Sequence, residues 1–311
     1  RKDRNPLMTQ VVHQSFATTS ERGLRHDILP MRLYHKAKKL GIWDPRSIDF
    51  SQDMLDWQRC TDQEKETLLQ LTSLFQAGEE GVTLDLLPLI MAVAQQGHIE
   101  EEMYLTTFLW EEAKHTEFFR RFLDEVAQHH SDLRQYHKPS YSMLFYETLP
   151  QTMHALLSDS SSQALARASV TYNMIIEGVL AETGYHAYFN MLERNNIMPG
   201  LRQGVSNIKR DESRHLAYGV FLISRLVAQD KTLWPFIEEQ MNALLVPALG
   251  VVTELYEGTE ELGELPFGLK MEEYLSYATM QFSKRMARIE RAREQTLEQL
   301  YQLPESETAE E

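Results

Sequence analysis

Two short segments of the chain carry the same order of acidic, basic and histidine side chains. They read EEAKH at residues 111–115 and DESRH at residues 211–215. Each contains Glu-x-x-His, and residues three apart share one face of a helix, so the carboxylate and the imidazole can bind one metal ion together. A single copy is weak evidence, because surface helices are rich in Glu and His. Two copies, each in a helix with a strong apolar face, favour a metal site.

One further carboxylate precedes each motif at nearly the same distance. Glu79 lies 33 residues before Glu112, and Glu177 lies 35 residues before Glu212. This separation suits a helix, a short turn and an antiparallel helix that returns alongside it. One Glu from each of two helices, with Glu-x-x-His from each of the other two, is the ligand set of di-iron and di-manganese bundles. The predicted metal ligands are therefore Glu79, Glu112, His115, Glu177, Glu212 and His215.

The surroundings of these carboxylates support the prediction. Glu177 stands in the apolar run MIIEGVL at residues 174–180, where an ionised carboxylate is costly to bury alone. Two divalent ions would balance the negative charges of four glutamates, and without metal we expect mutual repulsion to raise some of their pKa values. Carboxylates with one imidazole per ion suit iron or manganese. Such a site suits either redox chemistry with dioxygen or hydrolysis with two metal ions. The helical-bundle context favours the reaction with dioxygen, by analogy.

Other acidic and histidine residues have simpler interpretations. Glu182 follows Glu177 by five residues, and an ideal helix places the two on different faces. We expect Glu80, Glu111, Glu117 and Asp211 to face solvent or partners outside the ligand set. Six histidines lack a partner at ligand spacing, and we interpret them as surface or packing residues: His98, His129, His130, His137, His154 and His186.

The elements that must position the ligands are predicted to be helices. Apolar residues recur every three or four positions over 63–96, capped by Thr61 or Asp62, and Pro88 should kink this helix or end it early. We expect no strand pairs. The fold class is therefore all-α: one ferritin-like di-metal domain over residues 1–311, a four-helix bundle core with additional helices. Further helices are expected near 99–128, 141–157, 160–194, 199–228, 233–256 and 272–301, with residues 1–30 irregular and a disordered tail at 304–311.

Composition excludes several function classes. The formal net charge of −15 argues against nucleic acid, since phosphate binding needs clustered Lys and Arg. A single cysteine, Cys60, permits neither an internal disulfide nor a thiolate metal site, and it fits a cytoplasmic location. We find no apolar run that suits a signal peptide or a transmembrane segment.

Four segments together resemble the R2-like ligand-binding oxidases, which are relatives of the ribonucleotide reductase small subunit. They are FQAGEEGVTLD (75–85), EEAKH (111–115), YNMIIEG (172–178) and DESRH (211–215), and the resemblance extends over roughly residues 30–300. It implies a manganese/iron pair. Manganese would be held by Glu79, Glu112 and His115, and iron by Glu177, Glu212 and His215. The residues do not choose between Mn/Fe and Fe/Fe, because intrinsic affinities disfavour manganese.

The resemblance also implies an activity. The metals would react with dioxygen and oxidise a C–H bond by two electrons, with an ether cross-link forming between Val82 and Tyr172 and a long-chain fatty acid bound near the metals. Tyr172 lies five residues before Glu177, which a regular helix does not align, so we predict a π-bulge or another local distortion there. Tyr185 matches another family tyrosine near the site, with a redox role left open. A homodimer is the expected assembly.

Two other functions remain as alternatives. A ribonucleotide reductase small subunit would generate a radical for a larger partner, and many such subunits carry a tyrosine four residues after the first histidine, where this chain has Phe119. The presence of both Val82 and Tyr172 favours the oxidase. Iron storage would call for a shorter, cage-forming bundle, and a purely structural bundle does not need four inward glutamates, which are costly to bury.

Overall fold

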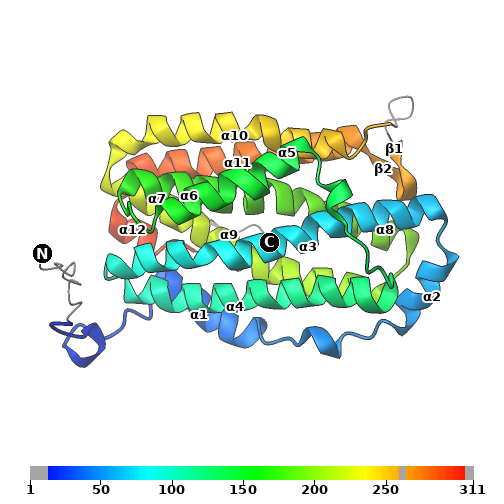
Figure 1. The fold of residues 1–311 in the computed structure, drawn as a ribbon. Helices are drawn as coiled ribbons and strands as arrows, with labels where there is room; N and C mark the ends of the chain where they lie inside the picture. The colour runs from blue at the N-terminus through cyan, green and yellow to red at the C-terminus, as the bar shows by residue number, and fades with distance from the viewer. Residues whose placement is uncertain (1–12, 259–263, 305–311) are drawn as a thin grey trace, which may run out of the picture.

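Four long helical stretches carry the predicted ligands. They are α3 (Asp62–Gln95), α4 (Ile99–Arg121), α9 (Pro199–Gln229), and a continuous stretch of α7 (Ser162–Ser169), a π-helical segment (Val170–Ala181) and α8 (Glu182–Asn195). The computed structural model describes residues 13–258 and 264–304. The stretches lie along one common axis (Figure 1), which confirms the predicted ferritin-like four-helix core.

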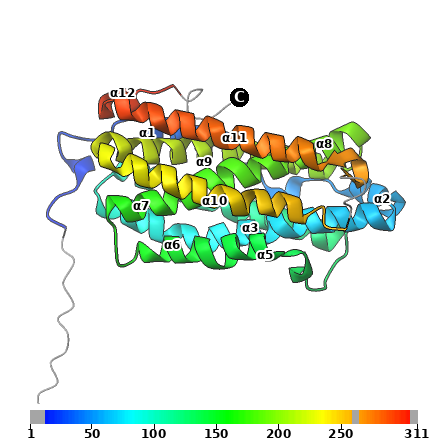
Figure 2. The same cartoon turned by 90° about the horizontal axis from the view of Figure 1, so that it is seen from above.

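Additional helices cover this core on two sides. α1 (Leu29–Leu40) packs against α4 and α9, and α10 (Trp234–Glu254) packs against the π-helical segment and α11 (Met271–Arg291). Figures 1 and 2 show α10 on the opposite side of the bundle from α1. The other helical elements are α2 (Ser51–Arg59), α5 (Pro139–Ser142), α6 (Leu149–Ala155), α12 (Leu297–Tyr301), the π-helical segments Phe122–Val126 and Met143–Thr148, and the 3-10 turns Ala17–Thr19, Pro45–Ser47, Arg134–Tyr136, Lys231–Leu233, Pro266–Gly268 and Ala292–Glu294.

α3 begins and ends within one residue of the predicted bounds of 63–96. The Thr61 hydroxyl accepts the backbone N–H of Glu64, and the Glu64 carboxylate accepts the N–H of Thr61, so two N–H groups at the helix start are satisfied. Of the two effects expected of Pro88, an early end of the helix is excluded, since α3 runs on to Gln95, and a kink stays a prediction. Pro88 removes one backbone hydrogen bond, but it is buried and α3 packs along the length of α4.

Other differences from the prediction are local. α1 and α2 were not predicted, and the helix expected over 272–301 divides into α11 and α12. The expectation of no strand pairs is wrong at one short hairpin, where β1 (Glu264–Leu265) pairs with β2 (Leu269–Lys270). Residues 305–311 of the predicted tail and residues 1–12 lie outside the described residues. Within 13–258 and 264–304, no helix combines the length and the apolar character needed to cross a membrane.

Candidate metal centre

The predicted ligands meet in the interior of the four-helix core, where all of them are buried. They form two overlapping groups, and within each group one ligand atom per residue lies within 4.8 Å of the others. Glu112 and Glu212 belong to both groups, as carboxylates that bridge two ions must. The groups are Glu79, Glu112, His115 and Glu212, and Glu112, Glu177, Glu212 and His215.

Four polar atoms of this cluster have no hydrogen-bond partner among the described residues. They are Glu112 Oε2, His115 Nδ1, Glu177 Oε1 and His215 Nδ1. A buried polar atom without a partner costs about as much as a lost hydrogen bond, so several together in one ordinary core would be unfavourable. Metal ions would satisfy them, and a set of carboxylate oxygens with two imidazole nitrogens suits iron or manganese. The residues present therefore fit a two-metal centre.

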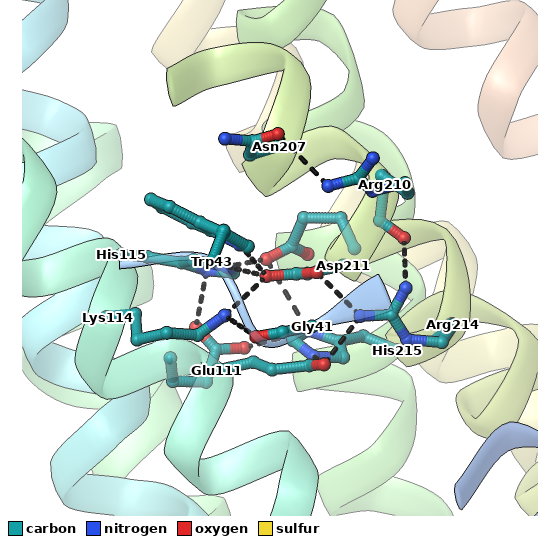
Figure 3. Close-up of polar contacts among 12 residues, drawn as sticks. Gly41, Trp43, Glu111, Lys114, His115, Asn207, Arg210, Asp211, Arg214 and His215 are labelled. Atoms are coloured by element: carbon teal, nitrogen blue, oxygen red, sulfur yellow. Dashed lines mark hydrogen bonds and ion pairs between the residues drawn. The ribbon is translucent and has the colours of Figure 1, made fainter. Parts of the chain in front are cut away.

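The acidic residue that opens each motif holds the histidine of the other motif. Glu111 Oε2 lies 2.8 Å from His215 Nε2, and Asp211 Oδ2 lies 3.2 Å from His115 Nε2 (Figure 3). Each imidazole can thus donate its Nε2–H outward and turn Nδ1 toward the cluster, the arrangement typical of metal-bound histidine. Glu111 and Asp211 were expected to face either solvent or partners outside the ligand set. Both are fully buried, so they face such partners and not solvent.

Basic residues in the same motifs neutralise these two carboxylates. One Arg214 nitrogen lies 2.5 Å from Glu111 Oε1 and 2.6 Å from Asp211 Oδ1, and Lys114 Nζ lies 3.1 Å from Asp211 Oδ2. Trp43 donates its Nε1–H to Asp211 Oδ2 at 2.7 Å. Figure 3 shows these groups converging on Asp211 from α4, from α9 and from the loop after α1. The shared basic residue before each histidine was visible in the sequence, whereas nothing in the sequence pointed to Trp43.

Burial, repulsion between carboxylates and hydrogen bonds to the histidines all shift pKa values in the cluster. Burial raises the pKa of Glu79 to about 8, and burial together with repulsion from Glu212 raises that of Glu177 well above its ordinary value. Although burial alone would lower the pKa of His115, hydrogen bonds to Asp211 and Glu112 raise it well above its ordinary value. The cluster without metal therefore holds protons that metal ions would displace.

Two tyrosines contact the cluster directly. Tyr172 donates its phenolic O–H to Glu112 Oε1 at 3.0 Å, and Tyr185 donates to Glu79 Oε1 at 3.1 Å. The predicted helix distortion is confirmed, since Tyr172 and Glu177 both lie in the π-helical segment Val170–Ala181. Its wider turn lets residues five apart face the same cluster. Val82 is buried one turn after Glu79.

A largely apolar cavity adjoins the cluster. Its volume is about 1010 Å³ with the open mouth included, and its lining contains Val82, Tyr185 and the four cluster glutamates. The rest of the lining comes mainly from α3, α8, α10, the π-helical segment and the β1–β2 hairpin, including Leu71, Phe75, Ile176, Leu180 and Val251. An apolar pocket with a few converging polar groups is the usual form of a small-molecule site. The sequence did not predict this cavity.

The remaining candidates lie away from the ligand groups. Glu80 and Glu117 are exposed, and Glu182 belongs to neither group. Phe119, at the place of the reductase tyrosine, is fully buried with its ring centroid 5.3 Å from that of Phe75. The six histidines interpreted as surface or packing residues also lie outside both groups: His98, His129, His130, His137, His154 and His186.

Comparison with known proteins gives the class of protein first. Residues 31–287 match the family described as ribonucleotide reductase, small chain. The structure is also similar to an R2-like ligand-binding oxidase with an aerobically reconstituted Mn/Fe cofactor, at 36% identity over 89% of this chain and 98% of that chain, with a TM-score of 0.84. Two variants of such an oxidase, each with one valine replaced and an anaerobically reconstituted Mn/Fe cofactor, are 36% and 37% identical over the same shares, with TM-scores of 0.84 and 0.83. The chain belongs to the R2-like ligand-binding oxidases of this small-chain family, and it is an oxidoreductase.

Metal loading should release protons and should weaken as the pH falls. Because the pKa of Glu79 is raised to about 8, a proton occupies this ligand at neutral pH, and each displaced proton costs roughly tenfold in apparent affinity per pH unit below that pKa. Calorimetric titration with Mn²⁺ and Fe²⁺ in buffers of different ionisation enthalpy counts the protons.

The matched variants are Glu79→Gln and Glu80→Gln, because Glu80 is the exposed neighbour of the buried ligand. The first should lower both the proton count and the affinity, and the second should change neither. An affinity that stays constant between pH 6 and 8 would contradict the displacement of protons.

Proposed function

We propose that the protein is a manganese/iron oxidase that uses dioxygen to oxidise a C–H bond by two electrons. The observation that carries this proposal is the position of Tyr172 and Val82, one donating to the shared ligand Glu112 and the other beside Glu79 in the cavity lining. We take residues 1–311 as one ferritin-like di-metal domain. A cytoplasmic location suits a chain with one cysteine.

We propose one metal ion for each of the two ligand groups, in the order that the family resemblance implies. Manganese would be held by the group that contains His115 and iron by the group that contains His215, with Glu112 and Glu212 shared. The Mn/Fe cofactors of the similar oxidases support this choice, although the ligand types also suit an Fe/Fe pair. When bound, the metal pair supplies the reaction with dioxygen that side chains alone do not perform.

The chain's own residues position the reacting groups. Glu111 and Asp211 hold the two imidazoles in one orientation, and the surrounding helices keep bulk water from the buried cluster. Tyr172 is held with its phenolic oxygen 3.0 Å from Glu112, so its proton has an acceptor. An ether bond between Tyr172 Oη and the tertiary Cβ of Val82 replaces one O–H and one C–H bond. Two electrons and two protons pass to the oxidant derived from dioxygen.

This proposal predicts a joined peptide. After the metal-free protein is loaded with Mn²⁺ and Fe²⁺ and exposed to air, digestion and mass spectrometry should find one species that contains both Val82 and Tyr172. It should be lighter than the two separate peptides by two hydrogen atoms.

The Tyr172→Phe variant lacks the phenolic oxygen and should give separate peptides with unchanged metal content. Separate peptides from the loaded wild-type protein would contradict the oxidase. A stable radical in their place would favour the alternative, a ribonucleotide reductase small subunit.

We propose that a long-chain fatty acid or a similar lipid-like ligand occupies the cavity, its acyl chain against the apolar lining. An organic extract of the purified protein should contain such an acid in proportion to protein. Ala187 lines the cavity, so the Ala187→Trp side chain would fill part of it and should lower the amount of fatty acid bound per protein chain. Ala113→Trp, at an exposed site on α4 outside the lining, should not. An extract without long-chain acid would refute the ligand.

We propose that two copies associate through the exposed apolar face of α3. Leu84, Leu87 and Met91 are exposed at helical spacing on this helix. Large exposed apolar patches mark interaction sites, and an isologous pair buries such a patch on both copies.

Light scattering should therefore give twice the mass of one chain. Leu87→Asp should give monomers, because the dimer would bury a charge. Leu157→Asp changes an exposed leucine elsewhere and should leave the dimer intact. A monomeric wild-type protein would exclude this assembly.

A further inference from the structure

A line of aromatic rings leads away from the metal centre between α4 and α9. The ring of Phe108 stacks on the predicted ligand His215 with centroids 3.6 Å apart. Tyr104, one turn before Phe108, lies 6.1 Å from it, and Tyr218 lies 5.2 Å from Tyr104. All of these rings are fully buried, so their spacing is set by tight packing.

The line continues to the surface at one end of the bundle. Phe221 lies 6.2 Å from Tyr218, and Tyr301 lies 5.8 Å from Phe221. Tyr301 is the last residue of α12 and is partly exposed, with the Arg25 guanidinium 4.7 Å over its ring. In Figure 1, α12 lies at the end of the bundle where α3 ends and α4 begins. Three phenols thus span the distance between the centre and solvent.

The middle phenol has a built-in proton acceptor. Tyr218 donates its O–H to Glu101 Oε2 at 2.9 Å, and Glu101 Oε1 lies 3.1 Å from Arg225 Nε. Tyr218, Glu101 and Arg225 are all buried. A buried ion pair is seldom worth its desolvation, since an apolar pair of similar size would stabilise the fold as well. A phenol with an adjacent carboxylate can, however, lose an electron and pass its proton over one hydrogen bond.

We propose that Tyr301, Tyr218 and Tyr104 form a one-electron route from the surface to the metal centre. The route rests on the proposed function, and it reduces an oxidant at the centre that neither Val82 nor a substrate has consumed. Tyr218 gives up one electron toward the centre and its phenolic proton to Glu101. Tyr104 has no hydrogen-bond partner among the described residues, so its phenol has no acceptor for a proton. It therefore only connects Tyr218 with Phe108, and the radical resides on Tyr218.

The remaining steps return Tyr218 and Tyr301 to their reduced, protonated state. Tyr301 gives one electron to the Tyr218 radical, which takes its proton back from Glu101, and the phenolic proton of Tyr301 goes to water. A small-molecule reductant such as ascorbate or a thiol then donates a hydrogen atom to the Tyr301 radical. Each passage thus oxidises one external reductant by one electron and leaves the protein unchanged.

The first experiment traps the radical at the surface. Reduced, metal-loaded protein is exposed to air with a nitroso spin trap, and peptide mass spectrometry maps the adducts. We expect an adduct on Tyr301 that Tyr218→Phe abolishes. Tyr188→Phe removes another buried phenol, which is hydrogen-bonded to Thr72 outside this line, and should leave the adduct unchanged. An equal adduct in Tyr218→Phe would overturn the route. So would the absence of the adduct from wild-type protein whose Val82–Tyr172 cross-link has already formed and which is reduced again before the exposure to air, because Val82 can then no longer consume the oxidant.

The second experiment does not depend on dioxygen or metals. A photogenerated ruthenium(III) oxidant in solution removes electrons from surface tyrosines of the metal-free protein, and freeze-quench electron paramagnetic resonance follows the radicals. We expect one tyrosyl component that is lost in both Tyr301→Phe and Tyr218→Phe and retained in Tyr188→Phe. Spectra unchanged in the first two variants would overturn the route. If no cross-link forms in air but this component appears, the proposed function fails and the route stands.

Discussion

Four carboxylates and two imidazoles share one buried space, and most of the surrounding structure offsets the cost of placing them there. Charges are seldom buried unless they are paired and hydrogen-bonded. Here the pairing is crossed, because Glu111 of α4 holds His215 of α9 and Asp211 of α9 holds His115 of α4. Arg214 contacts both acids at once, so these two acids are neutralised within the same two helices that carry the Glu-x-x-His pairs.

This crossed arrangement constrains the fold beyond the site. A shift of α4 against α9 by one residue would turn each acid about 100° away from its histidine, so the hydrogen bonds specify the register of the two helices. The loop after α1 is tied to the same point through Trp43 and Asp211. The π-helical segment Val170–Ala181 departs from regular geometry where Tyr172 and Glu177 must both reach the cluster. Local irregularity of this kind is concentrated at functional sites.

The sequence predicted the parts of the site that follow helical spacing. Both Glu-x-x-His pairs could be found because i and i+3 residues share a helix face, and Glu79 and Glu177 because their distance before each pair suits two antiparallel helices. The distortion at Tyr172 followed from a spacing that a regular helix cannot align. Contacts between distant segments had no such signal. Trp43 reaches Asp211 from a loop after a helix that was not predicted, and the cavity needs α10 and the hairpin, so both depend on tertiary packing. The helix does not end early at Pro88, because packing against α4 outweighs local propensity.

The charged side and the cavity side of the cluster differ in which residues can be exchanged without leaving a buried charge unpaired. On one side, α4, α9 and Trp43 form a charged network in which each member satisfies another, so removing one leaves a buried charge unpaired. On the other side, the cavity is walled by apolar residues such as Leu71, Leu180 and Val251, whose exchange alters shape and volume without unpairing a charge. The shape of the cavity can therefore vary on one side while the geometry of the predicted metal ligands is held from the opposite side.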